Sequence, residues 1–329
     1  MGESLKTTKT PDGRVLAFAI WGDPDGFPIM SLHGTPGSRL SRWPREDLYK
    51  ELGACIVTHD RAGYGRSTRR PGRTIADEAE DVLLLADTLE FERFAVSGGS
   101  GGGPHVLACA ALVSDRVIRA TCAVGIAPLG SPGLERDAFL DGMDPENVKE
   151  FGWAEAGEGV LSVELEREHA AMRERIAEDP STILGNFDLS ESDKAQLTRP
   201  EVHQVIRESV PEQAVNGVWG WVDDDLAFLR PWGFDVRDIS VPVLVEYGET
   251  DVLVPAAHGA WLAANVPDCV VKVDNEAGHM GSDPEREITE NVQWLRDGVP
   301  PPGSRQATLR DIAATLRIEE RELDAGGLN

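Results

Sequence analysis

Hydrophobic runs too short for helices alternate with amphipathic stretches along the first part of the chain. Short apolar runs between turn signals are typical of buried strands, whereas apolar residues three and four positions apart are typical of helices. The clearest helix is predicted over 74–89, where Ile75, Ala79 and Val82 share one face. The predicted strands are 14–21, 29–32, 54–58, 94–96 and 121–125. Because helices separate the strands, the pattern predicts crossover connections and a largely parallel sheet.

The N-terminal end departs from this alternation. Residues 4–10 and 14–21 are extended runs on either side of the turn Pro11-Asp12-Gly13. Turn residues between two such runs predict a β-hairpin. We therefore expect an antiparallel pair of strands at one edge of the sheet.

The alternation stops near Pro128 and resumes at 241–245, and the segment between them has a different composition. It holds four of the chain's eight tryptophans and is predicted to be helical over 164–178, 192–208 and 212–222. After the interruption, further elements are predicted: a strand over 270–273 and helices over 255–265 and 284–296. The economical interpretation is an all-helical cap inserted into an α/β core.

This organisation predicts four parts. The core is expected to comprise residues 1–128 and 235–298, the cap residues 129–234, and a C-terminal tail residues 299–329. The tail is predicted to hold an amphipathic helix with an apolar stripe formed by Leu309, Ile312, Ala313 and Leu316. Such a stripe packs either against the core or across a homodimer contact.

Composition narrows the class of partner. The 329 residues are 41% hydrophobic, enough for one large core with an insertion. The net charge of −25 repels nucleic acid and anionic membranes, and favours a small-molecule substrate instead. No apolar run approaches the roughly 20 residues of a membrane helix, and no signal-peptide pattern is present, so a cytoplasmic protein is expected.

One loop is basic, and it contains Arg61, Arg66, Arg69, Arg70 and Arg73. It is expected to be a solvated segment paired with nearby acids rather than an anion site.

The cysteines point to neither metal nor disulfide chemistry. They are widely spaced in apolar segments, without a Cys-x-x-Cys pair: Cys55, Cys109, Cys122 and Cys269. Thiols in this setting are typical of buried core residues. We expect no metal and no cofactor.

Five glycines surround Ser100 in the run 98–103, between a predicted strand and the helix-like segment 105–113. Gly98 and Gly102 fit the Gly-x-Ser-x-Gly nucleophile elbow, in which the serine is held in a strained conformation and its neighbours must lack side chains. A flexible glycine loop and a phosphate-binding turn are the alternatives for this run taken alone.

A serine nucleophile requires a base, and the base an orienting acid. His279 follows the last predicted strand of the core, and Asp251 follows the strand before it. Loops at the carboxyl ends of parallel strands meet at one rim of the sheet, so Ser100, Asp251 and His279 can converge. Glu249 is the nearest competitor of Asp251 for the role of the acid.

A second loop is expected beside the elbow. The segment from His33 through Gly34 and Thr35 to Pro36 follows the strand 29–32. We assign the backbone amides of Thr35 and Gly101 to an oxyanion hole, where donors stabilise the tetrahedral intermediate of acyl transfer. His33 is expected to be a buried hydrogen-bonding residue that shapes this loop rather than a catalyst.

Taken together, these motifs make the chain resemble a capped α/β hydrolase from about Arg14 to Gly298. The motifs that carry the resemblance are the loop 33–36, the segment 60–67, the elbow, 248–251 and 278–279. The resemblance implies eight mostly parallel strands, a helical cap after the sixth, and esterase, lipase, lactonase, thioesterase, peptidase or related activities. Haloalkane dehalogenases and epoxide hydrolases of this family carry aspartate at the elbow, so Ser100 argues against both.

We therefore expect a serine hydrolase that acts on an ester, lactone or related acyl compound. An aminopeptidase of the proline iminopeptidase type is an alternative, in which the acids Asp223, Asp224 or Asp225 receive the substrate's ammonium; an exposed cluster at a helix end is the simpler interpretation of these acids. A cofactor-independent haloperoxidase or dioxygenase-like protein and a non-catalytic ligand-binding protein on the same fold are further alternatives.

The cap is expected to set substrate choice, since aromatic side chains would form the apolar walls of the pocket. The residues assigned to this pocket are Trp219, Trp221, Phe228 and Trp232. Gly101, which lacks a side chain beside the nucleophile, is expected to leave the acyl pocket wide.

Overall fold

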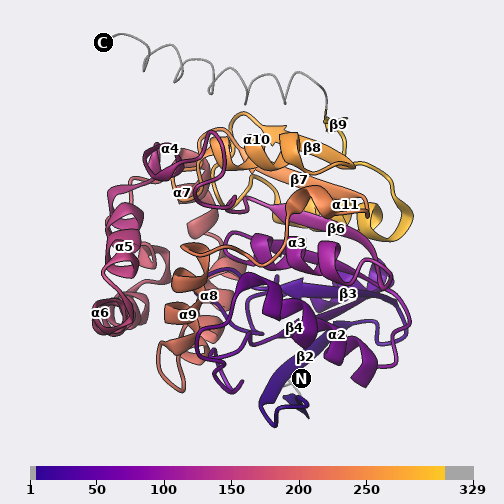
Figure 1. The fold of residues 1–329 in the computed structure, drawn as a ribbon, viewed down its shortest axis with the longest axis horizontal. Helices are drawn as coiled ribbons and strands as arrows, with labels where there is room; N and C mark the ends of the chain where they lie inside the picture. The colour runs from indigo at the N-terminus through magenta and orange to yellow at the C-terminus, as the bar shows by residue number, and fades with distance from the viewer. Residues whose placement is uncertain (1–4, 308–329) are drawn as a thin grey trace.

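A computed structural model describes residues 5–307 of the chain, and within them one nine-stranded sheet forms the centre (Figure 1). Its strand order is β1-β2-β4-β3-β5-β6-β7-β8-β9. The strands are β1 (Lys6–Lys9), β2 (Val15–Gly22), β3 (Phe27–Leu32), β4 (Ala54–His59), β5 (Phe94–Gly99), β6 (Val117–Ala123), β7 (Val243–Gly248), β8 (Cys269–Asp274) and β9 (Arg305–Gln306). The single sheet with helices between its strands, which the alternating pattern predicted, is thereby confirmed.

The pairing is parallel from β4 through β3, β5, β6 and β7 to β8. At one edge, β1 and β2 form the predicted antiparallel hairpin, with Lys6 opposite Phe18. At the other edge, β9 adds an antiparallel pair to β8 and makes nine strands where eight were expected. A two-residue strand carries no hydrophobic pattern, so the sequence could not indicate it.

Helices cover both faces of the sheet. Residues of α2 (Glu78–Thr88), α3 (Gly102–Leu112) and α10 (Ala256–Asn265) pack into the larger apolar cluster on one face. Residues of α1 (Glu46–Glu51) and α11 (Pro284–Asp297) pack into a second cluster on the other face. Two layers of helix around a parallel sheet bury both sheet faces, which explains the nearly continuous apolar runs of the strands.

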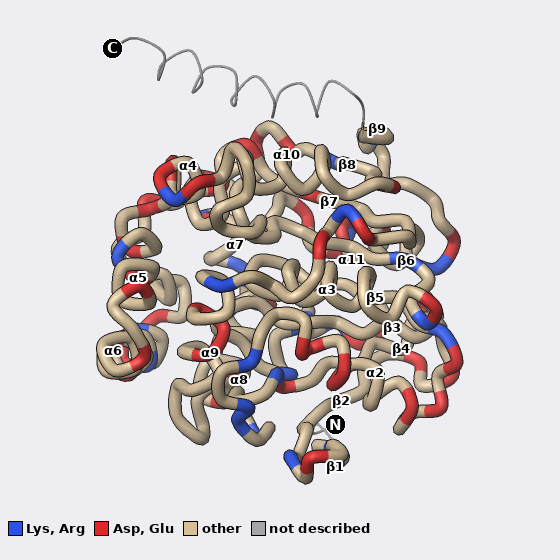
Figure 2. Tube along the Cα trace, viewed as in Figure 1, with Lys and Arg blue, Asp and Glu red and all other residues tan. Residues whose placement is uncertain are grey.

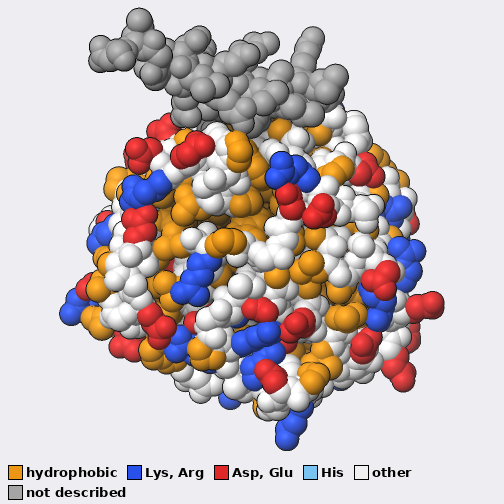
Figure 3. Space-filling model, viewed as in Figure 1, with side chains coloured by type: hydrophobic (Ala, Val, Ile, Leu, Met, Phe, Trp, Pro, Cys, Tyr) orange, Lys and Arg blue, Asp and Glu red, His pale blue; other side chains and the backbone are white. Residues whose placement is uncertain are grey.

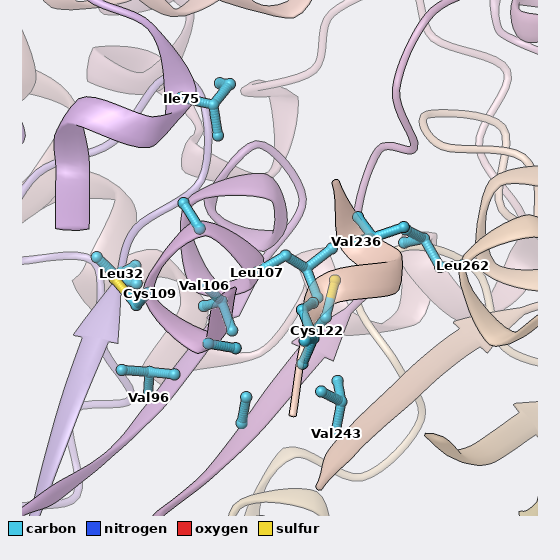
Figure 4. Packing of buried hydrophobic residues seen from close by; sticks show 14 of the residues in the cluster. Leu32, Ile75, Val96, Val106, Leu107, Cys109, Cys122, Val236, Val243 and Leu262 are labelled. Atoms are coloured by element: carbon cyan, nitrogen blue, oxygen red, sulfur yellow. The ribbon is translucent and has the colours of Figure 1, made fainter. Parts of the chain in front are cut away.

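The larger cluster joins α3 to the middle of the sheet. Figure 4 shows Val106 and Leu107 of α3 beside Val96 of β5 and Cys122 of β6. All four cysteines of the chain are buried, as the apolar segments around them predicted.

Only helices and loops lie between β6 and β7 in the chain. We call the helices of this segment the cap; they are α4 (Arg136–Leu140), α5 (Pro145–Glu155), α6 (Glu158–Glu178), α7 (Glu191–Leu197), α8 (Pro200–Gln213) and α9 (Trp219–Phe228). Short 3-10 turns lie within it at Pro180–Thr182 and after it at Val236–Asp238. In Figure 1, α5, α6, α8 and α9 gather on one side of the sheet, at the left. The single helix predicted over 192–208 is two helices, because Pro200 cannot continue α7 and instead occupies the first turn of α8.

The charged residues are spread over the surface. Figure 2 shows acidic positions on most elements, and the face in Figure 3 has acidic and basic side chains interspersed with hydrophobic ones. Within residues 5–307, no helix is both long and apolar enough to cross a membrane. The predicted tail helix with Leu309 and Leu316 lies outside the described residues.

Candidate active site

Ser100 lies in the sharp turn between β5 and α3, with a backbone φ of 55°. Few residues other than glycine adopt a positive φ, and strain of this kind persists only where the surroundings enforce it. Here the Ser100 N–H donates to Ala123 O of β6 at 3.0 Å, and Gly103 N–H donates to Ser100 O at 2.9 Å. The turn therefore holds Ser100 at the carboxyl end of the sheet's central strands.

The glycines on either side of Ser100 are required by close contacts. A Cβ on Gly98 would lie 2.8 Å from Leu32 O and 2.9 Å from Val106 Cγ2, and a Cβ on Gly102 would overlap Leu32 O. All three contacts of these hypothetical Cβ atoms are shorter than real Cβ contacts allow. The elbow spacing of glycines thus follows from how closely β3 approaches the turn.

Asp251 and His279 meet as the strand order requires. His279 Nδ1 and Asp251 Oδ2 are 2.7 Å apart, and the Asp251 side chain is fully buried. Asp251 Oδ1 accepts the N–H groups of Leu253 and Val254, at 2.8 and 2.9 Å. These two hydrogen bonds hold the Asp251 carboxylate in one orientation. Because the carboxylate in turn binds Nδ1 of His279, it orients the imidazole and leaves Nε2 for proton transfer.

The pKa of His279 is set by opposing effects. Burial on its own would lower it, but the Asp251 carboxylate, and more weakly that of Asp193, raise the pKa above its ordinary value of 6.5. Glu249, the competing acid, is exposed and only its backbone N–H is engaged, with Asp274 O. The structure therefore brings His279 to Asp251 rather than to Glu249.

The loop 33–36 packs against the elbow. A Cβ on Gly34 would lie 3.4 Å from Ser100 Cβ, and the Cβ position of Gly101 lies 3.0 Å from Thr35 N. Gly101 is also the N-cap of α3, whose dipole favours negative charge at this end. Thr35 and Gly101, whose amides were assigned to an oxyanion hole, are thus neighbours beside Ser100.

His33 is a buried part of this loop. Its Nδ1 contacts Gly34 O at 2.7 Å and its Nε2 accepts Arg61 N–H at 3.2 Å. Burial, followed by the Arg61 charge, lowers the pKa of His33 well below its usual value. A neutral ring with both nitrogens engaged by backbone groups shapes the loop and is not available as a base.

Asp224 of the cap helix α9 lies at the centre of a buried charge network that reaches the same loop. Its Oδ2 accepts from Thr35 Oγ1 at 2.6 Å, from Arg61 Nη2 at 2.6 Å and from Tyr64 Oη at 2.8 Å. Its Oδ1 accepts from Arg73 Nη2 at 2.6 Å. Burial alone would raise the pKa of Asp224, but the two guanidiniums hold it well below its usual range.

This network corrects two expectations. Asp223, Asp224 and Asp225 do not form an exposed cluster at a helix end, because all three are at most 5% exposed. Arg61 and Arg73 are not solvated, because both are buried against Asp224. Three aspartates inside an otherwise apolar helix were the available signal, since buried carboxylates need cationic partners.

The arginine loop pairs largely with the cap rather than with acids close in sequence. Arg69 binds both carboxylate oxygens of Asp223 at 2.9 Å, and Arg66 contacts Glu212 at 2.7 Å. With Asp223 and Asp224 both paired to arginine, neither has a free charge with which to bind a substrate ammonium. Of the three aspartates considered for such a group, only Asp225 is left without an arginine partner among those described.

A cavity of about 140 Å³ lies under the cap beside the site. It is bounded by the loop 33–36, by the turn after Asp251 and by cap side chains, among them Thr35, Pro36, Leu253, Glu150, Trp153, Met172, Phe187 and Trp221. Of the four aromatic residues assigned to the pocket, Trp221 lines this cavity and donates its Nε1–H to Glu150 at 2.8 Å.

The other three aromatic residues are placed elsewhere. The Arg69 guanidinium lies over the Trp219 ring, with its Cζ 4.1 Å from the ring centroid. Phe228 packs against His105 in the core. Trp232 lines a separate groove of about 580 Å³ with Phe234 and Trp261. Helical spacing indicated buried aromatics but could not say which cluster each side chain enters.

Gly101 does not widen an acyl pocket. A Cβ at this position would overlap Thr35 Oγ1 and lie 2.6 Å from Thr35 Cβ. The threonine side chain fills the space that the missing side chain leaves, and its hydroxyl is anchored there by Asp224. Gly101 is therefore required by the close approach of the loop 33–36.

Comparison with known proteins agrees with this geometry. The family described as alpha/beta hydrolase fold matches residues 28–286, so the chain belongs to this family and is an enzyme of the α/β hydrolase class. It is 27% identical over 268 residues to a non-heme chloroperoxidase from Streptomyces lividans, covering 80% of this chain and 88% of the relative.

Two further similarities point to hydrolytic relatives. A proline iminopeptidase from Neisseria meningitidis is 26% identical over 300 residues, covering 85% of this chain and 91% of the relative. The structure of a thermophilic esterase from Thermogutta terrifontis is 25% identical with a TM-score of 0.58, covering 90% of this chain and 99% of the other. The relatives share the class of enzyme and differ in their named reactions.

Proposed function

We propose that the protein is a serine hydrolase that cleaves a carboxylic ester, lactone or related acyl bond of a small molecule. The observation that carries the proposal is the 2.7 Å contact between His279 Nδ1 and Asp251 Oδ2, on the same sheet rim as a serine held at φ 55°. Acyl transfer requires an oriented base and a nucleophile, and the oriented His279 together with the strained Ser100 supports the proposal.

In the proposed reaction, Ser100 Oγ attacks the acyl carbon while His279 Nε2 takes the hydroxyl proton. The amides of Thr35 and Gly101 receive the oxyanion, and His279 then returns the proton to the departing alcohol. Water activated by the same nitrogen attacks the acyl-enzyme, and collapse of the second intermediate frees Ser100 and the acid. Asp251 stabilises the imidazolium in both steps.

A panel of p-nitrophenyl esters, lactones and aminoacyl anilides tests this proposal, run on the wild type beside Ser100→Ala. We expect ester or lactone turnover in the wild type alone, together with covalent labelling of Ser100 by a fluorophosphonate probe. Wild-type protein that turns over no acyl compound and is not labelled would overturn the proposal.

An aminopeptidase is the second candidate, favoured by the acidic lining of the cap cavity. Burial raises the pKa of Glu150 to about 7, and burial together with Glu150 raises the pKa of Asp225 well above its usual value. Asp225 Oδ2 is buried and has no hydrogen-bond partner within residues 5–307. A pair of carboxyl groups that retains a proton beside the cavity would transfer it to the neutral amine of a substrate, and the resulting ammonium would then pair with two carboxylates.

Glu150→Gln separates the two candidates. An aminopeptidase would lose turnover of aminoacyl anilides in this variant, whereas an esterase would keep its turnover of neutral esters. Glu155→Gln is the matched control, because Glu155 ends the same helix and pairs with Arg136 outside the cavity. Equal effects of the two substitutions on anilide turnover would show that Glu150 does not bind the substrate's amino group.

A further inference from the structure

The histidine loop is held by a buried carboxylate from the cap. Asp193 of α7 is fully buried, its Oδ2 accepts the N–H of His279 at 3.0 Å and its Oδ1 accepts the N–H of Met280 at 2.7 Å. Both oxygens of one side chain thus bind consecutive backbone amides of the loop that carries the proposed base. Hydrogen bonds to a charged acceptor are about twice as strong as neutral ones.

The position of Asp193 in its own helix makes this arrangement unusual. Ser190 is the N-cap of α7 and its Oγ accepts Asp193 N–H at 3.1 Å. An acidic residue at this third helical position ordinarily turns back to the N-cap backbone as a capping box. Here both carboxylate oxygens of Asp193 bind the backbone amides of residues 279 and 280 instead. Capping of α7 therefore does not explain why an aspartate stands at this position.

Further contacts tie the same cap helix to the same loop. Ser192 Oγ donates to Gly281 O at 2.9 Å, and Gln196 Nε2 donates to Ser282 O at 2.9 Å. A Cβ on Gly278 would overlap Asp193 Oδ2 and also Ser190 Oγ. The glycine beside His279 is therefore required by the close approach of α7.

We propose that Asp193 is a positioning residue through which the cap holds the proposed catalytic base: it fixes the backbone of His279 while Asp251 fixes the imidazole. The proposal rests on the proposed function. Its consequence is that the base is in place only when α7 is docked on the core, since Asp193 binds the backbone of His279 itself while Ser192 and Gln196 bind the loop further on.

Asp193 also acts on the charge of the base. Its carboxylate and that of Asp251 both raise the pKa of His279 against the lowering effect of burial. His279 also lines a separate cavity of about 280 Å³, and the other charged side chains of that cavity are Glu246, Lys272, Asp274 and Glu287. Lys272 is paired with Glu246 and Glu290, and the carboxylates of Asp274 and Glu287 accept backbone N–H groups. Removing Asp193 alone leaves these groups unchanged.

The test compares Asp193→Asn with Glu191→Gln. Each variant removes one negative charge from α7, but the Glu191 side chain is 92% exposed and pairs only with Lys194 among the described residues. For Asp193→Asn we expect kcat on the best ester of the panel to fall about 10-fold to 100-fold with little change in KM, because a small misplacement of a catalytic group costs this much. Glu191→Gln should match the wild type.

A second readout does not depend on turnover. Histidine side-chain NMR titration, with the His279 signal assigned from a His279→Gln variant, should show a lower pKa for His279 in Asp193→Asn and an unchanged pKa in Glu191→Gln. If the wild type turns over no ester, the proposed function fails while this titration still decides the role of Asp193. An unshifted His279 pKa together with wild-type kcat in a folded Asp193→Asn protein would overturn the positioning role.

Gly278→Ala covers the case in which Asp193→Asn does not fold. It retains the charge and pushes the carboxylate away from the loop, so kcat should fall as in Asp193→Asn. Where both single variants fold, their effects on kcat should be less than additive in the double variant, since both act on one contact. Wild-type kcat in Gly278→Ala, or full additivity in the double variant, would contradict the proposal.

Discussion

Thr35 Oγ1 donates a 2.6 Å hydrogen bond to Asp224 Oδ2, across 189 residues of sequence. The donor belongs to the loop beside Ser100 and the acceptor to the cap helix α9. Because Arg61 binds both Asp224 and the carbonyl oxygen of Gly34, the carboxylate organises the whole loop. The cap is thus part of the framework that holds the proposed oxyanion hole, in addition to covering the site.

Asp224→Asn should destabilise the protein strongly. The substitution leaves the buried guanidiniums of Arg61 and Arg73 without their shared carboxylate, and breaking a buried ion pair typically costs about 3–5 kcal/mol. Asp223→Asn on the same helix is the control and should cost less, because its partner Arg69 is partly exposed to water. Denaturant unfolding measures both, and equal losses would contradict a special role for Asp224.

Ser100→Ala should abolish acyl turnover, with a loss of about 10⁴-fold or more in kcat, while the unfolding midpoint stays near that of the wild type. The strain at φ 55° resides in the backbone, and alanine fits wherever serine fits. Steady-state kinetics and thermal unfolding are the measurements. Turnover by Ser100→Ala at the wild-type rate would exclude Ser100 as the nucleophile.

Asp251→Asn should lower kcat by about 10⁴-fold, because an amide cannot stabilise the imidazolium and favours the wrong tautomer of His279. Glu249→Gln, on the same loop but exposed, should leave kcat within a few-fold of the wild type. The two variants are compared on one substrate. A larger loss in Glu249→Gln would transfer the role of the acid to Glu249.

The dependence of kcat/KM on pH should rise through one ionisation with a midpoint above 6.5. His279 must be neutral to accept the Ser100 proton, and Asp251 and Asp193 raise its pKa above this ordinary value. Activity is therefore lost as the pH falls through the raised pKa. A midpoint well below 6.5 would show that the carboxylates do not act on the base in this way.

Gly101→Ala should reduce the turnover of small and bulky esters alike. The added Cβ collides with Thr35 and displaces the loop 33–36, so the loss falls on the shared chemistry and leaves acyl selectivity unchanged. Gly99→Ala is the control, since the nearest contact of its Cβ would be 3.3 Å. The measurement is the ratio of specificity constants for acetate and branched-acyl esters, and a ratio that shifts toward acetate would restore the wide-pocket interpretation.

Much of the candidate site could be predicted from the sequence because its signals are local. Ser100 is marked by glycines within two positions, and Asp251 and His279 each follow a buried strand. The parallel order of strands then places the three loops on one rim. These predictions need only the period of the hydrophobic pattern and the steric requirements of a turn.

The residues that support the site could not be predicted in the same way. Asp193 meets His279 across 86 residues and Asp224 meets Thr35 across 189, and neither carboxylate carries a local motif that names its partner. The assignment of Trp219, Phe228 and Trp232 to one pocket failed for the same reason. Hydrophobic spacing shows that a side chain is buried, whereas its neighbours depend on how the cap helices dock on the core.

The sequence by itself determined the α/β fold, the helical insertion between β6 and β7, and the loops that bear the candidate catalytic residues. Each of these follows from interactions between residues close in the chain. Only the tertiary structure decided that Asp193 and Asp224 of the cap are buried against the two loops beside Ser100. A buried carboxylate is stable only where donors or cations surround it, and here those groups come from segments that folding alone brings together.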